Sequence, residues 1–175
     1  MIPLRFTVED AQKASDAWSF NCGPGALCGL LGMTPDELRP NLGEFEQKGY
    51  TNPTLMKDAL GRLGRTFTQI YRGDVPQEKP TLAVNGLLRI QWGGPWTKPG
   101  VPMRVRYRHT HWVASSLTSG TFLPRIFDVN ATCSGWIRYR EWSEQLVPWL
   151  LKQCEPKSDG TWWVTHAWEV NAAPK

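Results

Sequence analysis

The chain contains the stretch Cys22-Gly-Pro-Gly-Ala-Leu-Cys28-Gly-Leu-Leu-Gly32, whose pattern predicts a buried helix. Proline is tolerated in the first turn of a helix because its missing N–H would have no partner there. Apolar side chains then recur at three- and four-residue spacing, as on a helix face that packs into a core: Ala26, Leu27, Leu30 and Leu31. Gly32 is a typical helix stop. We therefore expect Cys22 at, or just before, a helix N-terminus.

The segments on either side of this helix indicate an α+β protein. Further helices are expected at 34–38, 52–63 and 142–151, and strand-like segments at 67–71, 81–84, 87–91, 104–117, 125–129 and 162–170. Helices followed by antiparallel-looking strands favour α+β over the alternating order of a parallel sheet. We expect a single domain over residues 1–175, with a helical lobe at about 8–66 and a β lobe at about 67–175.

Composition excludes several classes of protein. The 175 residues hold four Cys, too few for a disulfide scaffold, and no apolar run approaches the roughly 20 residues of a membrane span. The N-terminal residues lack the charged and apolar regions of a signal peptide. We therefore expect a cytoplasmic protein without a membrane partner. A net charge of +4 allows a nucleic-acid partner but does not favour one.

Two further stretches carry polar residues on expected strands. His111 falls within the strand expected at 104–117, where period-two alternation places it with Val113 on one face and an arginine row on the other: Arg104, Arg106 and Arg108. Asp128 follows 17 residues later, a separation typical of a hairpin. Asp128 and Asn130 share a face, so either could orient the His111 ring, and we favour Asp128.

These residue types fit nucleophilic catalysis. The thiolate is the reactive form of cysteine, and a helix N-terminus favours that anion. A neighbouring imidazolium lowers the thiol pKa further and later gives its proton to a leaving amine. A carboxylate or amide on the next strand holds the ring in the required tautomer.

The order Cys22, His111, Asp128, with Asn-Cys-Gly-Pro at a helix start and His-Trp-Val on a strand, resembles the papain-like cysteine peptidases. The bacteriocin-processing C39-like branch is the most similar, over about residues 10–132. The resemblance implies Cys22 as nucleophile, His111 as general base and acid, and Asp128 as orienting residue. It also implies a helical lobe packed on an antiparallel sheet, with a cleft between them.

The resemblance departs at one position. Those families place a glutamine, which donates to the oxyanion, about six residues before the cysteine, whereas this chain has Asp16 there. A carboxylate repels an oxyanion unless it is protonated. Asn21, Gln12 and the backbone N–H of Cys22 are therefore equal candidates for the oxyanion hole.

The expected function is a cysteine hydrolase that cleaves a peptide, isopeptide or related amide bond through a thioester, without a cofactor. Its partner would be a peptide or protein substrate, and a phage- or bacterium-encoded accessory hydrolase fits a chain without a transporter segment. Two alternatives remain open. One is an inactive papain-like fold that binds protein or nucleic acid; the other is an acyl transferase with the same triad.

Other residues have less specific interpretations. Ten tryptophans cannot all face a ligand, and the candidates for a substrate cleft are Trp18, Trp92, Trp96 and Trp112. Cys28, Cys133 and Cys154 are expected to be structural. Zinc would need the ligand set of Cys22, Cys28, His109 and His111, but five residues separate the cysteines, outside the usual two to four. We therefore expect no metal.

Overall fold

The computed structural model describes residues 5–18, 21–117, 122–130, 135–154 and 156–171, and Cys133 lies outside this part of the chain. It is an α+β structure with a six-stranded antiparallel sheet. The helices are α1 (Val8–Ala17), α2 (Cys22–Leu31), α3 (Pro35–Leu38), α4 (Phe45–Lys48), α5 (Pro53–Arg62), α6 (Met103–Arg106), α7 (Tyr139–Glu141) and α8 (Val147–Lys152), with η1 (Arg39–Asn41), η2 (Pro95–Thr97) and the π-helical η3 (Trp142–Leu146) between them. The strands are β1 (Phe67–Arg72), β2 (Asn85–Trp92), β3 (Thr110–Ser116), β4 (Arg125–Phe127), β5 (Ile137–Arg138) and β6 (Trp162–Val170).

The expected helix starts and stops are confirmed by their local hydrogen bonds. α2 begins at Cys22 and ends before Gly32, whose φ of 66° is the left-handed cap that glycine adopts without strain. The Thr34 side chain accepts from the backbone N–H of Glu37 at the start of α3. Asn52 accepts from the Leu55 N–H at 2.8 Å at the start of α5. These side chains satisfy N–H groups that would otherwise lack partners.

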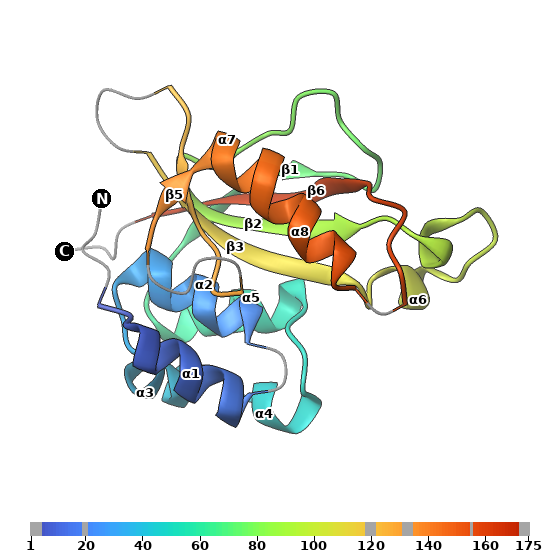
Figure 1. Ribbon diagram of the computed structural model, residues 1–175. Helices are drawn as coiled ribbons and strands as arrows, with labels where there is room; N and C mark the ends of the chain where they lie inside the picture. The colour runs from blue at the N-terminus through green and yellow to red at the C-terminus, as the bar shows by residue number, and fades with distance from the viewer. Residues whose placement is uncertain (1–4, 19–20, 118–121, 131–134, 155, 172–175) are drawn as a thin grey trace.

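The sheet has the order β1-β6-β2-β3-β4-β5, so the last long strand lies between the first two. The helices α1–α5 lie on one side of it, and the segment from α7 to α8 lies on the other (Figure 1). Each side has its own core. Leu87, Trp112 and Trp168 pack towards α2, whereas Leu88, Val113 and Val164 pack towards Trp142 and α8.

Two glycines of α2 let the helix lie against the end of β4. A Cβ at Gly29 would overlap the ring of Phe127, and a Cβ at Gly25 would overlap Val129. Because Asp128 stands between these two residues, the glycine face of α2 brings the helix directly beside Asp128.

The strand expected at 104–117 is wrong in its first half. Met103–Arg106 forms α6, with the N–H of Arg106 bonded to the Pro102 carbonyl, and β3 begins only at Thr110. The arginine row therefore does not form a strand face. Its alternation with apolar residues was consistent with a strand, but Pro102 begins a helical turn instead. The segment 81–84 is likewise not a strand.

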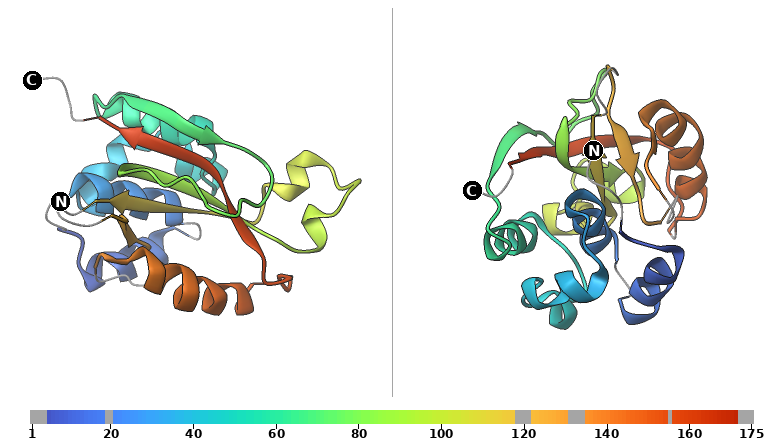
Figure 2. Two further views of the ribbon diagram at one scale, coloured as in Figure 1. Left: turned by 90° about the horizontal axis from the view of Figure 1, so that it is seen from above. Right: turned by 90° about the vertical axis from the view of Figure 1, so that its left-hand side faces the viewer.

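The sheet extends beyond the helical lobe. Seen from above, the segment that contains η2 and α6 projects past the end of the sheet, away from α1–α5 (Figure 2). No helix in the described ranges has the length and apolar character needed to cross a bilayer.

Candidate active site

Cys22 is the first residue of α2 and is half-buried. Its sulfur is hydrogen bonded to the side chain of His111 and to the backbone N–H of Trp112. The thiol thus lies at the positive end of a ten-residue helix and beside two donors from β3. The three features act together to favour the thiolate.

The short strand β4 explains why a sulfur reaches the β3 backbone. β4 pairs only with residues 114–116 of β3, where Ala114 is opposite Phe127 and Ser116 is opposite Arg125. Among the described residues, the first half of β3 therefore has no strand neighbour on that side, and its N–H groups need other partners. Cys22 takes the Trp112 N–H at this open edge.

Asp128 holds the imidazole of His111. Their Nε2 and Oδ1 atoms are 2.8 Å apart, and the two side chains are 5% and 0% exposed. Because Nε2 is occupied by Asp128, Nδ1 is the ring nitrogen left for the thiol. Figure 1 shows the elements that meet here, the start of α2, the strand β3 and the end of β4.

The carboxylate of Asp128 is itself fixed by two other donors. The indole N–H of Trp142 donates to Oδ2 at 2.8 Å, and the backbone N–H of Asn130 donates to Oδ1 at 3.0 Å. Buried carboxylates need such donors to remain ionised. The Asn130 side chain is exposed, so of the two orienting candidates Asp128 is the one that contacts His111.

The pKa values follow from these contacts. Burial opposes ionisation of Cys22, but the hydrogen bond and charge of His111 outweigh it, so the thiol pKa lies below its ordinary value. Burial also disfavours the imidazolium, yet Asp128 and Cys22 raise the pKa of His111 to about 10. His111, Trp142 and Asn130 lower the pKa of Asp128 against the effect of burial. Both shifts favour the thiolate–imidazolium form of the pair over the neutral form.

Two tryptophans complete the surroundings of His111. The ring of Trp92 stacks on the imidazole with 5.5 Å between centroids and 24° between planes, and Trp92 is only 8% exposed. Trp142 is fully buried on the other side of Asp128. No sequence signal pointed to Trp142, because an indole N–H that binds a carboxylate has no recognisable spacing.

The candidates for the oxyanion hole are placed differently. Gln12 is exposed, and its amide donates to the Asp16 carboxylate at 2.8 Å, one turn further along α1. Asn21 is half-buried at the N-cap of α2, directly before Cys22, and its side chain does not cap the helix. The side-chain amide of Asn21 and the Cys22 N–H therefore lie next to the sulfur in the chain, whereas the Gln12 amide has another partner.

The other candidates for the cleft are core residues. Trp18 packs edge-on against Phe45, and Trp112 is 1% exposed beneath α2, so the prediction that they line a cleft is wrong. Trp96 is buried as well and stacks on His109 at 3.8 Å. These indoles supply apolar area to the two cores.

The zinc ligand set is not brought together. Cys28 is fully buried in the helical core, where burial raises its pKa, and His109 is engaged with Trp96. In the described part of the chain no cluster of three or more His, Cys, Asp or Glu side chains is placed to hold a metal ion.

Comparison with known proteins gives no family for this chain. No protein-family model matches it, and neither a curated protein nor a solved structure matches it significantly.

Proposed function

We propose that the protein is a papain-like cysteine hydrolase, most similar to the C39-like peptidases, that cleaves a peptide, isopeptide or related amide bond. Cys22 is the nucleophile, His111 the general acid and base, and Asp128 the orienting residue. The observation that carries the proposal is the continuous chain of contacts from the Cys22 thiol through His111 to Asp128. The fold, with its cysteine on a helix and its histidine on an antiparallel sheet, supports it.

The reaction needs only groups that this site contains and water. The Cys22 thiolate attacks the carbonyl carbon, and the electron pair of the C=O bond moves onto oxygen. When the C–N bond breaks, the His111 imidazolium gives its proton to the leaving amine and a thioester remains. Neutral His111 then takes a proton from water, and the hydroxide displaces the thiolate. The carboxylic acid product loses its proton to solvent. The imidazolium–thiolate pair is thereby restored.

Alkylation with iodoacetamide at pH 6, followed by mass-spectrometric mapping, tests the activated pair. We expect selective labelling of Cys22 over Cys28 and Cys154, because burial raises the pKa of both of the latter thiols. His111→Ala should abolish the selectivity, whereas His109→Ala, a substitution of the histidine that stacks on Trp96, should preserve it. Equal, slow labelling of all cysteines would refute an activated Cys22.

One contact favours the alternative of an inactive binding module. The bond between Gln12 and Asp16 keeps one amide away from an oxyanion. A panel of fluorogenic peptide amides separates the two functions, because a binding module would alkylate at Cys22 without turnover. An added amine in the same assay separates hydrolysis from acyl transfer, since a transferase would form the amine adduct.

A further inference from the structure

Arg89 is a buried cation that forms no ion pair among the described residues. It lies on β2, is 4% exposed, and has no carboxylate within 4.0 Å among the described residues. Its Nη1 and Nη2 donate to the hydroxyls of Thr165 and Thr110 at 3.4 and 3.2 Å, while its Nε has no hydrogen-bond partner in the same part of the chain. Burial of a charge with only neutral partners is costly, so this arginine needs an explanation beyond packing.

Arg89 belongs to the same region as the nucleophile. It is directly opposite Trp112 in the register of β2 and β3, and the Trp112 N–H binds the Cys22 sulfur. Opposite residues of an antiparallel pair point to the same face. The Arg89 side chain is therefore on the helical side of the sheet, one strand away from Cys22, and its charge interacts with the thiolate.

A cavity of about 420 Å³ opens next to this arginine. Thr165 and Tyr107 line it, and both contact the Arg89 guanidinium, Tyr107 through its ring at 5.0 Å. Gln91 lines it too and lies two residues beyond Arg89 on β2, a step of about 7 Å along an extended strand. The cavity thus begins about two residues along β2 from the position opposite Trp112, the residue whose N–H faces Cys22.

The cavity wall also contains an unsatisfied acceptor. Gln91 is 2% exposed, and its Nε2 donates to three backbone carbonyls, of Trp92, Arg106 and His109. Those bonds fix the orientation of the amide and leave Oε1 without a partner among the described residues. The amide is therefore held rigidly in the wall of the cavity.

The charges around the cavity are unequal. Arg106 is in the wall and Arg89 is behind it, while Asp74 is the one carboxylate of the lining. Asp74 is exposed and accepts a hydrogen bond from the Tyr107 hydroxyl at 2.6 Å. Apolar side chains, including Val75 and Met103, supply the rest of the surface. The lining suits a ligand with a short apolar stem and a negative end.

We propose that this cavity is a substrate subsite that binds an acidic side chain of the peptide, with Arg89 and Arg106 attracting its carboxylate. The inference rests on the proposed cysteine hydrolase function and adds the chemical class of residue near the scissile bond. The carboxylate supplies a negative charge near Arg89, which forms no ion pair among the described residues.

Peptide affinity labels test the subsite. The labels are chloroacetyl peptides that carry Glu, Gln or Lys at the first, second or third residue and that alkylate Cys22. Each alkylation rate is divided by the rate for iodoacetamide, which corrects for the reactivity of the thiol itself. We expect Glu at the second residue to react about tenfold faster than Gln, the gain of one charge-assisted contact, and Lys to react most slowly. Arg106→Met should lower the ratio of the Glu rate to the Gln rate, because only the charge of Arg89 then remains.

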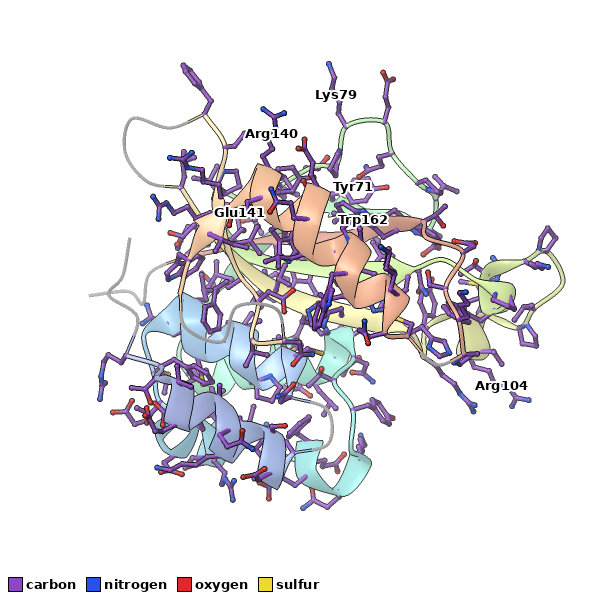
Figure 3. The ribbon with its side chains drawn as sticks, in the orientation of Figure 1. Tyr71, Lys79, Arg104, Arg140, Glu141 and Trp162 are labelled. Atoms are coloured by element: carbon purple, nitrogen blue, oxygen red, sulfur yellow. The ribbon has the colours of Figure 1, made fainter. Side chains whose placement is uncertain are left out.

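The controls separate this inference from the proposed function. Arg104→Met should leave the ratio unchanged, because Arg104 extends from α6 away from the sheet (Figure 3) and is exposed. Where Arg89→Met does not fold, Arg89→Lys is used instead. It keeps the charge and should therefore keep part of the preference for Glu over Gln in the alkylation rates. Equal rates for Glu and Gln at all three positions, with selective iodoacetamide labelling intact, would overturn the subsite alone.

A binding measurement covers the case of an unreactive thiol. Calorimetric titration of the Cys22→Ser protein with acetylated Glu and Gln peptides measures their affinity for the cavity without alkylation of the protein. We expect about tenfold tighter binding of the Glu peptide. Equal affinities would contradict the subsite whether or not Cys22 is reactive, whereas slow alkylation together with preferred Glu binding would contradict only the hydrolase.

Discussion

Substitution of Trp142 by Phe removes the indole N–H that binds Asp128 and keeps an aromatic ring in place. The bond is 2.8 Å long, between a carboxylate that is fully buried and a tryptophan that is fully buried. A hydrogen bond to a charged group contributes about 1.5–3 kcal/mol to stability. Its loss should also raise the pKa of Asp128, because the Trp142 N–H is one of the donors that lower it. Loss of the larger ring adds a packing cost of about 2 kcal/mol.

Trp168→Phe is the matched control. Trp168 is also fully buried, but its Nε1 has no hydrogen-bond partner among the described residues. Both substitutions remove the same atoms, so only Trp142→Phe should show the electrostatic part of the loss. At pH 7, urea unfolding should find Trp142→Phe less stable than the control by about 1.5–3 kcal/mol.

The pH dependence of the extra loss of stability in Trp142→Phe, relative to Trp168→Phe, identifies its origin. Asp128 has a lowered pKa in the folded protein, so its stabilising effect is present at neutral pH and is lost as the pH falls through that value. Once Asp128 is protonated in both proteins, the Trp142 bond is to a neutral group and the excess should shrink. An excess that stays constant down to the lowest pH with a complete unfolding transition would refute the reasoning.

Three other perturbations have defined outcomes. Turnover should fall as the pH rises through about 10, because His111 there loses the proton that the leaving amine needs. Alkylation of the Cys22 thiol should continue at that pH. Parallel loss of turnover and alkylation would argue against His111 as the general acid. Asp16→Ala should release the Gln12 amide and raise kcat by at least about tenfold. Adding Gln12→Ala to this variant should cancel the gain. An unchanged kcat in Asp16→Ala would exclude Gln12 from the oxyanion hole. In urea unfolding, Gly29→Ala should lower the free energy of unfolding by about 1–3 kcal/mol, because the new Cβ would overlap the ring of Phe127. Gly61→Ala, which lies in open space within α5, should raise it by about 0.5–1 kcal/mol. Equal effects of the two substitutions would contradict the close approach of α2 to β4.

Local sequence signals were sufficient for the ends of α2, α3 and α5 and for the contact between His111 and Asp128. The cap residues Thr34 and Asn52, and the turn at Gly32, act within a few residues of themselves, so the sequence predicted where α2, α3 and α5 begin or end. The contact between His111 and Asp128 follows from a hairpin of β3 and β4, which is also a short-range feature. Such signals do not depend on how distant segments pack.

The failures had two sources, a local pattern that fits two structures and contacts between distant segments. The alternation around Arg104 and Arg106 fits a strand as well as a single helical turn, and the choice was made by Pro102 and by carbonyls of residues 98 and 101 that bind Arg106. The position of β6 between β1 and β2 follows from packing across the whole sheet. The orienting bond from Trp142 joins two cores that the sequence does not connect.

The arrangement at Asp128 makes the chemistry of one sulfur dependent on both halves of the interior. Cys22 packs with the helical core, while Trp142 belongs to the core beneath α8, and the carboxylate joins them. Partial melting on either side would remove contacts that lower the pKa of the Cys22 thiol. The alkylation rate of Cys22 should therefore report whether the two cores are packed on the sheet. It should respond to local opening of either core under conditions where the chain as a whole is still folded.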